Sequence, residues 1–164
     1  MTKQKFGALI GEQETTQRFD LGEETTLPSG SKYRYFKNYT TGALTAYYTY
    51  VYDPDTWTIV GGLTTTVAAS GEVHPLCVPQ IAITQGTTAT SYYFWAFVGP
   101  GEATFVCSDA VAAEAKIYTT ATAGTIGDNS SSTVLIPGLI SYDAIASATD
   151  SGTCHARTEL YVSN

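Results

Sequence analysis

The sequence predicts an all-β protein, an antiparallel sandwich or barrel of short strands with an extended N-terminal arm. Threonine is the commonest residue and the 164-residue chain holds 12 tyrosines, and both residue types suit pleated, half-buried surfaces. Its 15 glycines and 6 prolines recur as turn signals between short apolar runs. Only residues 108–116 carry a helical pattern, and an irregular loop fits that segment equally well.

The N-terminal segment, residues 1–18, is predicted to be the extended arm. It is polar apart from Phe6 and residues 8–10, and it shows neither a helical stripe nor a long alternation. A loosely packed terminus is the alternative interpretation. A single β domain then covers residues 19–164, or two small lobes that divide near residues 85–90.

The predicted strands of this domain are short and are separated by turn signals such as Gly61–Gly62. The clearest covers residues 44–52, in which alternate side chains fall on opposite faces. Such regular short strands indicate a sandwich or barrel. The predicted strands are 31–37, 44–52, 56–60, 63–68, 72–78, 80–84, 91–98, 103–107, 133–140 and 154–162.

The charge and cysteine content exclude several classes of partner. The formal net charge is −7, and the eight basic residues form no run, so a nucleic acid would be repelled rather than bound. No apolar run is long enough for a secretory signal or a membrane span. Three cysteines cannot all pair, so we expect reduced thiols in a protein made in a cytoplasm.

The candidate chemical groups point away from catalysis and metal binding. His74, Cys77, Cys154 and His155 are zinc-ligand types, but their spacing places neighbours on opposite faces of a strand. There is no G-x-S-x-G nucleophile motif, and the acidic residues that stand near one another fall in predicted turns. We therefore expect no catalytic residues, no metal, no cofactor and no enzymatic activity.

The aromatic residues form two clusters, one within residues 33–57 and one within residues 92–97. Core packing with cross-strand ladders is the first interpretation. A protein interface is the second, since tyrosine and tryptophan are enriched there. A sugar platform is the third, because flat rings stack on the faces of pyranoses.

The order of these segments resembles that of the small capsid decoration proteins of tailed phages. The matching phrases, in chain order, are Phe19-Asp20-Leu21-Gly22, the turn and aromatic strand of residues 29–35, the aromatic strand, glycine turn and strand of residues 93–106, then Val111-Ala112-Ala113, Ile117-Tyr118-Thr119 and residues 133–140. The resemblance covers about two thirds of the chain. Two positions depart from the pattern: Glu114 stands where glycine is common, and Pro137-Gly138-Leu139 where many relatives read I-G-x-A.

The resemblance implies a structural virion protein that decorates and stabilises the outer surface of a phage capsid. Its partners would be the major capsid protein and neighbouring decoration subunits in a homo-oligomer, after synthesis in the host cytoplasm. The group has no catalytic residues to transfer. A carbohydrate-binding β module of a virion fibre or appendage is the alternative function.

The predicted arm is the candidate capsid-binding segment. An extended chain advances about 3.3 Å per residue, so residues 1–18 can reach across a neighbouring subunit. A segment that orders on binding can also wrap a large surface. The alternative is an arm folded back on its own domain. Lys3, Lys5 and Arg18 would supply charge contacts, and Phe6, Leu9 and Ile10 would be apolar anchors.

Overall fold

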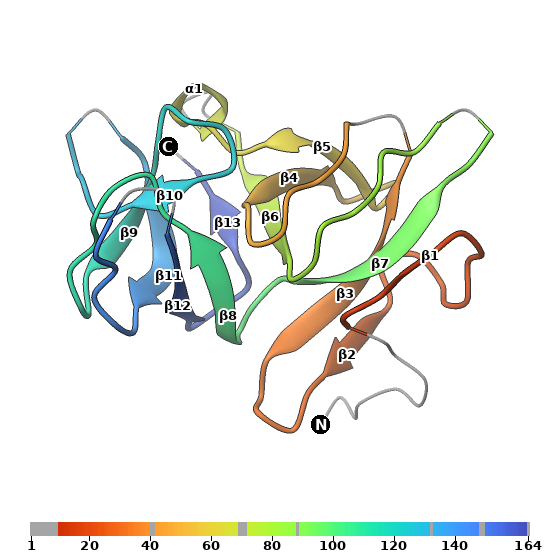
Figure 1. Ribbon diagram of the computed structural model, residues 1–164, viewed down its shortest axis with the longest axis horizontal. Helices are drawn as coiled ribbons and strands as arrows, with labels where there is room; N and C mark the ends of the chain where they lie inside the picture. Colours follow the sequence, from red (N-terminus) through yellow and green to blue (C-terminus); the bar gives the residue numbers. More distant parts are fainter. Residues whose placement is uncertain are drawn as a thin grey trace.

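The computed structural model describes residues 10–39, 42–68, 72–87, 89–131, 133–147 and 150–163 (Figure 1). The predicted all-β class is confirmed, with 45% strand and 3% helix in a closed five-stranded barrel beside a second sheet. The elements are β1 (Gln13–Glu14), β2 (Glu24–Thr26), β3 (Lys32–Asn38), β4 (Tyr50–Asp53), β5 (Thr58–Gly62), α1 (Thr65–Ala68), β6 (His74–Pro79), β7 (Tyr92–Phe97), β8 (Gly101–Val106), β9 (Lys116–Thr119), β10 (Ile126–Gly127), β11 (Leu135–Ser141), β12 (Ser151–Ala156) and β13 (Tyr161–Val162).

The barrel closes because β7 pairs with both β3 and β6, while β5 and β4 complete the ring between them. Its pairings are antiparallel except for β3 with β5. Alternation along each strand separates an inner face from an outer face. On β3, Phe36 points inward, whereas Tyr33 and Tyr35 belong to a second cluster outside the barrel. The interior is filled by Phe36, Leu44, Tyr50, Tyr52, Ile59, Cys77, Ile83, Phe94, Ala96 and Val98.

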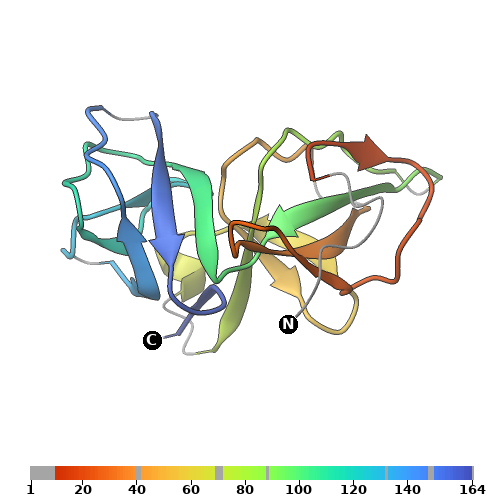
Figure 2. The same ribbon diagram turned by 90° about the horizontal axis from the view of Figure 1, so that it is seen from below.

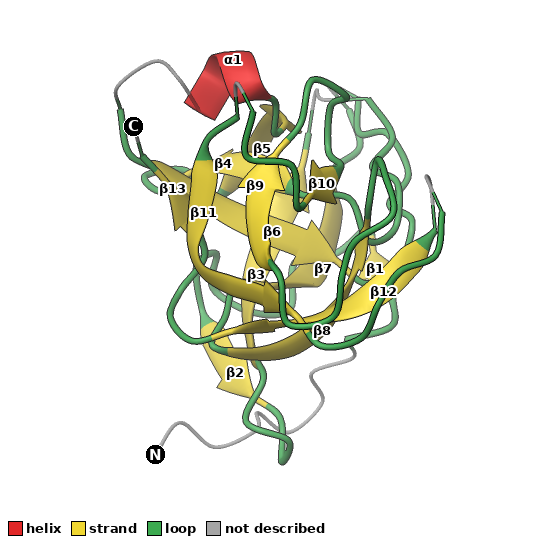
Figure 3. Ribbon diagram, turned by 90° about the vertical axis from the view of Figure 1, so that its left-hand side faces the viewer, coloured by secondary structure: helices red, strands yellow, loops and turns green. Residues whose placement is uncertain are grey.

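The second sheet lies beside the barrel in Figure 1 and faces the viewer in Figure 3. One hydrophobic cluster is common to the sheet and the barrel. Its strand order is β10-β9-β11-β12-β8, with neighbours antiparallel. The inner face carries fully buried residues such as Phe105, Ile117 and Cys154. Phe105 meets Phe97 of the barrel edge to face, with ring centroids 6.1 Å apart. Because one hydrophobic cluster joins both layers, they pack as a single unit.

Side chains of the barrel cover the free edge of β8. The Ser31 hydroxyl accepts from the Glu102 amide at 3.1 Å and donates to the Glu102 carbonyl at 2.9 Å. The Gln80 side-chain amide makes the same pair of bonds with the backbone of Thr104, at 3.1 and 3.2 Å. These two side chains act as a neighbouring strand would, so the exposed ladder groups of an edge strand are satisfied.

The change of sheet falls between the end of β7 at Phe97 and the start of β8 at Gly101. Residues 85–90, where a division into two lobes was predicted, lie between β6 and β7. The C-terminal β13 returns from the second sheet to pair with β6 of the barrel. The chain therefore crosses between the two layers twice.

The strand predictions for residues 63–68, 44–52 and 80–84 were wrong. Residues 63–68 include α1 instead of a strand, because the Thr64 hydroxyl caps the turn by accepting from the Val67 amide at 3.2 Å. In residues 44–52 only the end belongs to a strand, β4. Tyr47 has a φ of 66°, which breaks the alternation, and its amide donates to the Pro79 carbonyl at 2.7 Å.

Two segments are less regular than their patterns suggested. Residues 80–84 contribute only the isolated bridge between Ile83 and Leu44. Residues 108–115 form bends, a bridge and a turn, so the loop interpretation of residues 108–116 is the right one and the helical interpretation is wrong. The helical pattern of its alanines is overridden by Val111, which bridges Ile145 and is buried in the shared core.

Candidate functional site

The structure describes only part of the predicted arm. Lys3, Lys5, Phe6 and Leu9 lie outside the described residues. Residues 13 and 14 form β1, which pairs with β7 at the end of the barrel far from the second sheet (Figure 2). Capsid binding by this segment remains a prediction.

The two described arm residues of the predicted set lie on the chain's own barrel. Ile10 is half-buried and packs against the shared core. Arg18 is exposed, its side chain pairs with Glu14 at 2.9 Å, and its amide donates to the Tyr35 hydroxyl at 3.3 Å. The segment from residue 10 to residue 18 therefore follows the barrel surface.

The aromatic clusters serve mainly as core, which confirms the first interpretation for their buried members. Phe19 lies edge-on to Tyr35 and Trp95, with ring centroids 5.3 and 5.2 Å away. The glycine that ends the Phe19–Gly22 phrase has a φ of +81°, and an added Cβ would lie 2.3 Å from the Trp57 ring. The buried aromatics are Tyr33, Tyr35, Phe36, Tyr50, Tyr52, Phe94, Trp95 and Phe97.

The four zinc-type residues do not meet. Cys77 lies in the barrel interior, Cys154 in the shared core, and His155 on the solvent side of the second sheet. Within the described residues, no group of three or more histidines, cysteines, aspartates or glutamates is placed to hold a metal ion.

The three cysteines are free, as the sequence predicts, and all three are buried. Burial raises the pKa of the Cys107 thiol to about 12, and burial likewise raises the pKa of Cys77 and of Cys154. A thiol reacts as its thiolate, so these three groups are poor nucleophiles at neutral pH.

One group of charged side chains closes an end of the barrel interior. We call it the Arg34 cluster: Arg34, Glu24, Glu159, Lys32, Tyr52 and Trp57. Arg34 Nη1 donates to the Tyr52 hydroxyl at 2.7 Å, and Nη2 pairs with Glu24 and, at 3.0 Å, with Glu159. Its guanidinium lies 5.0 Å from the centroid of the Trp57 ring, close enough for a cation–π contact.

Lys32 completes the cluster, 3.3 Å from Glu24 and 3.2 Å from Glu159. Burial raises the pKa of Tyr52 to about 12, although the Arg34 charge opposes this, so the hydroxyl stays protonated. For Glu24, burial raises the pKa, but the hydrogen bonds and charges of Arg34 and Lys32 outweigh it and lower the pKa below 4.5. The charges of this cluster are engaged with one another, so its role is structural.

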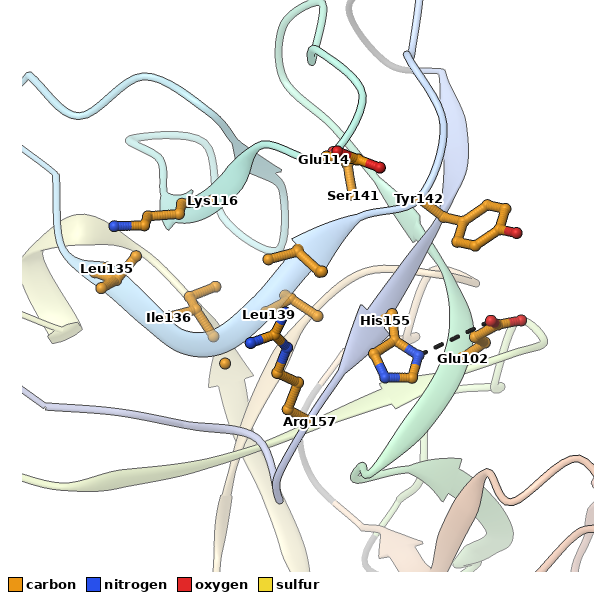
Figure 4. Close-up of a pocket in the computed structure, with 12 residues that line it drawn as sticks. Glu102, Glu114, Lys116, Leu135, Ile136, Leu139, Ser141, Tyr142, His155 and Arg157 are labelled. Atoms are coloured by element: carbon orange, nitrogen blue, oxygen red, sulfur yellow. Dashed lines mark ion pairs between the residues drawn. The ribbon is translucent and has the colours of Figure 1, made fainter.

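A broad concavity lies on the solvent side of the second sheet (Figure 4). We call it the outer groove. It has a volume of about 1030 Å³. Its walls come from β8, β9, β11 and β12 and the turns that flank them. It is lined by Glu102, Glu114, Lys116, Leu135, Ile136, Gly138, Leu139, Ile140, Ser141, Tyr142, His155 and Arg157.

Strand register places four groove residues in one row across the sheet. Ile140 of β11 stands opposite Lys116 on one side and His155 on the other, and His155 stands opposite Glu102. His155 Nδ1 approaches Glu102 Oε1 to 3.9 Å, longer than a hydrogen bond. Tyr142 follows at the end of β11, with 62% of its surface exposed.

The groove is shaped by two irregularities that coincide with the two departures from the decoration-protein pattern. The pairing of β11 with β9 shifts register between Leu135 and Ile140, where Gly138 has a φ of +74°. Glu114 has a φ of +57°, a left-handed conformation that favours glycine. Ser141 holds this turn, since its hydroxyl accepts from the Ala115 amide at 2.9 Å and donates to the Ala112 carbonyl at 2.6 Å.

The polar side chains of the groove have spare hydrogen-bonding capacity. Among the described residues, no hydrogen bond to protein engages the side chains of Glu102, Glu114, Lys116, Tyr142 or Arg157. These groups therefore face solvent on a concave surface, where a ligand can reach several of them at once.

Sequence reasoning missed this groove, although part of its signal was present. In residues 154–157 the buried Cys154 and Ala156 alternate with His155 and Arg157, which places the latter two on the solvent face. Tyr142 is an isolated aromatic outside both clusters. Pro137 and Gly138 within the predicted strand 133–140 were a signal for the bulge in β11, whereas the turn at Glu114 left no comparable pattern.

Comparisons with known proteins add no further constraint. The described part of the chain contains no helix of the length and hydropathy that a membrane crossing needs. A scan against models of protein families, a search of curated proteins and a search of solved structures each found no match.

Proposed function

We propose that this chain is a structural virion protein that decorates the outer surface of a tailed-phage capsid by binding the major capsid protein. The observation that carries the proposal is the order of sequence phrases shared with decoration proteins. Two of those segments lie where parts of the fold meet. Phe19–Gly22 docks on the aromatic residues of β3 and β7, and residues 93–106 form β7, the glycine turn and β8.

The packing supports a role that demands rigidity. The free edge of β8 is covered by Ser31 and Gln80, and one core unites both layers. A protein that clamps the joints between capsid subunits must resist deformation when packaged DNA pushes the shell outward. A close-packed interior has that property.

The capsid contact in this proposal is the N-terminal segment together with the barrel surface that it follows. Lys3 and Lys5 supply cationic contacts, and Phe6, Leu9 and Ile10 supply apolar ones. Arg18, which is exposed on the barrel surface beside Glu14, supplies a further charge contact. Neighbouring decoration subunits are a second partner for the same segment.

The test is co-sedimentation of the purified chain with empty capsids assembled from the major capsid protein of the same virus. We expect saturable binding, and mass spectrometry of purified virions should find hundreds of copies. The double substitution Lys3→Glu and Lys5→Glu should weaken binding strongly, whereas the control Lys116→Glu in the outer groove should not.

Absence of binding by the unaltered chain, together with absence from virions, would reject the proposal. A copy number of tens or fewer would favour the alternative, a module of a fibre or appendage.

A further inference from the structure

We propose that the outer groove is a binding site for an uncharged oligosaccharide. The Tyr142 ring stacks on one sugar, and the side chains of Glu102, Glu114 and His155 form hydrogen bonds with the hydroxyls of that sugar. This inference goes beyond capsid decoration and does not depend on it. It rests on the chemistry and geometry of the groove alone.

Tyr142 is the first support. Its ring is 62% exposed at the groove rim, while most aromatic rings of the chain are buried or half-buried. Its backbone is fixed, because its amide donates to the Thr153 carbonyl at 2.9 Å. A pyranose presents a flat face of C–H groups edged by hydroxyls, which matches an aromatic ring with polar neighbours.

The Glu102 and His155 pair is the second support. The two side chains face each other on adjacent strands but remain 3.9 Å apart, so neither satisfies the other (Figure 4). A carboxylate accepts from two hydroxyls at once, and an imidazole both donates and accepts. Neighbouring hydroxyls on a sugar ring offer the complementary set of donors and acceptors.

Glu114 is the third support. Its φ of +57° is a conformation that glycine adopts without strain and other residues adopt at a cost. Its turn is held by the Ser141 hydroxyl, so the carboxylate is presented at the groove from a fixed backbone. A strained residue that places a functional group at a concave surface indicates a binding role.

The groove chemistry disfavours other ligand classes. Two carboxylates, Glu102 and Glu114, balance the cations Lys116 and Arg157, so no positive potential is focused there for a phosphate. A protein partner is disfavoured because interface centres are depleted of charged residues. Small-ligand sites span about 300–1,000 Å³, so a groove of about 1030 Å³ suits several linked sugars better than one.

The position of the groove is compatible with capsid attachment. It lies on the second sheet, whereas β1 lies at the opposite end of the barrel (Figures 1 and 2). If the N-terminal side contacts the shell, the groove stays accessible from outside.

The test is a nuclear magnetic resonance titration of the ¹⁵N-labelled full chain with maltotetraose, cellotetraose and tetra-N-acetylchitotetraose. We expect at least one to shift the amides of residues 138–142 and 153–157 in a saturable way. Tyr142→Ala should weaken that binding at least tenfold, and Glu102→Gln and Glu114→Gln should weaken it less. The matched control is Tyr161→Ala, since Tyr161 is a partly exposed tyrosine on β13.

Two outcomes would overturn the inference: none of the three tetrasaccharides shifts groove amides, or Tyr142→Ala binds as tightly as the unaltered chain. The amide spectrum of each variant reports folding directly, so loss of binding is separated from loss of structure. If Tyr142→Ala instead abolished capsid binding while no sugar bound, the groove would be a protein contact. That result would reject this inference and leave capsid decoration standing.

Discussion

The Arg34 cluster and the outer groove are built from the same residue types but differ in whether their charges are engaged. In the Arg34 cluster, a guanidinium, an ammonium and two carboxylates contact one another within 3.3 Å. In the groove, His155 and Glu102 stand 3.9 Å apart, and this pair carries opposite charges only when the imidazole is protonated. Charged residues therefore hold the fold where they pair with one another and remain available to a ligand where they do not.

Burial explains the difference. Arg34 is 8% exposed and lies at the end of a barrel packed with aromatic side chains, so its charge must be compensated inside the protein. The side chains of His155 and Glu102 are 41% and 56% exposed, and water screens them. The charged side chains of the Arg34 cluster therefore need partners for the fold to be stable, whereas those of the outer groove do not.

The largest effect that tests this comparison is expected from Arg34→Met. The substitution keeps most of the side-chain volume but leaves Glu24 and the Tyr52 hydroxyl without their main partner. Because Glu24 is partly exposed, we expect the free energy of unfolding to fall by about 2–3 kcal/mol rather than the larger loss of a fully buried pair. Urea unfolding at neutral pH measures it.

The matched control is Arg157→Met, which removes a groove cation of the same kind. We expect a change within about 0.5 kcal/mol, as for most surface substitutions. Equal losses in the two variants would break the distinction between the two regions.

A smaller effect is expected in the pH dependence of the Arg34 cluster. The Arg34 and Lys32 contacts lower the folded-state pKa of Glu24 below 4.5, so its carboxylate stabilises the fold above that pH. This contribution is lost as the pH falls from 4.5 through the lowered pKa. The difference in unfolding free energy between the unaltered chain and Glu24→Gln should therefore shrink over that window. A difference that stays constant from neutral to acidic pH would show that the Glu24 charge does not stabilise the cluster.

The smallest effect, with the opposite sign, is expected from Glu114→Gly. Removing the strain of a left-handed non-glycine residue raises the free energy of unfolding by about 1–2 kcal/mol. The greater conformational freedom of glycine in the unfolded chain lowers it by about 0.4–1 kcal/mol. We expect a net stabilisation of up to about 1.5 kcal/mol, measured by thermal unfolding. The converse substitution Gly138→Ala, at a φ of +74°, should destabilise. A clear loss of stability in Glu114→Gly would mean that the carboxylate supports the fold.

The strands that sequence reasoning located best are those with apolar residues on both faces. Segments 31–37, 91–98 and 133–140 agree closely with β3, β7 and β11, because their β-branched and aromatic residues are consistent with the burial they reach. Strands of two residues, such as β1 and β10, have no pattern long enough to detect. In residues 63–68 a local cap overrode the strand preference of three threonines and a valine.

The sequence by itself determined the all-β class, the aromatic core and the free cysteines, because these follow from residue type and alternation. Only the tertiary structure decided which charges are compensated. Arg34 meets Glu159, which is 125 positions later, and Lys116, His155 and Glu102 share one row only because four strands align in register. Such contacts depend on long-range pairing and on bulges such as that at Gly138, which shift the register of a strand.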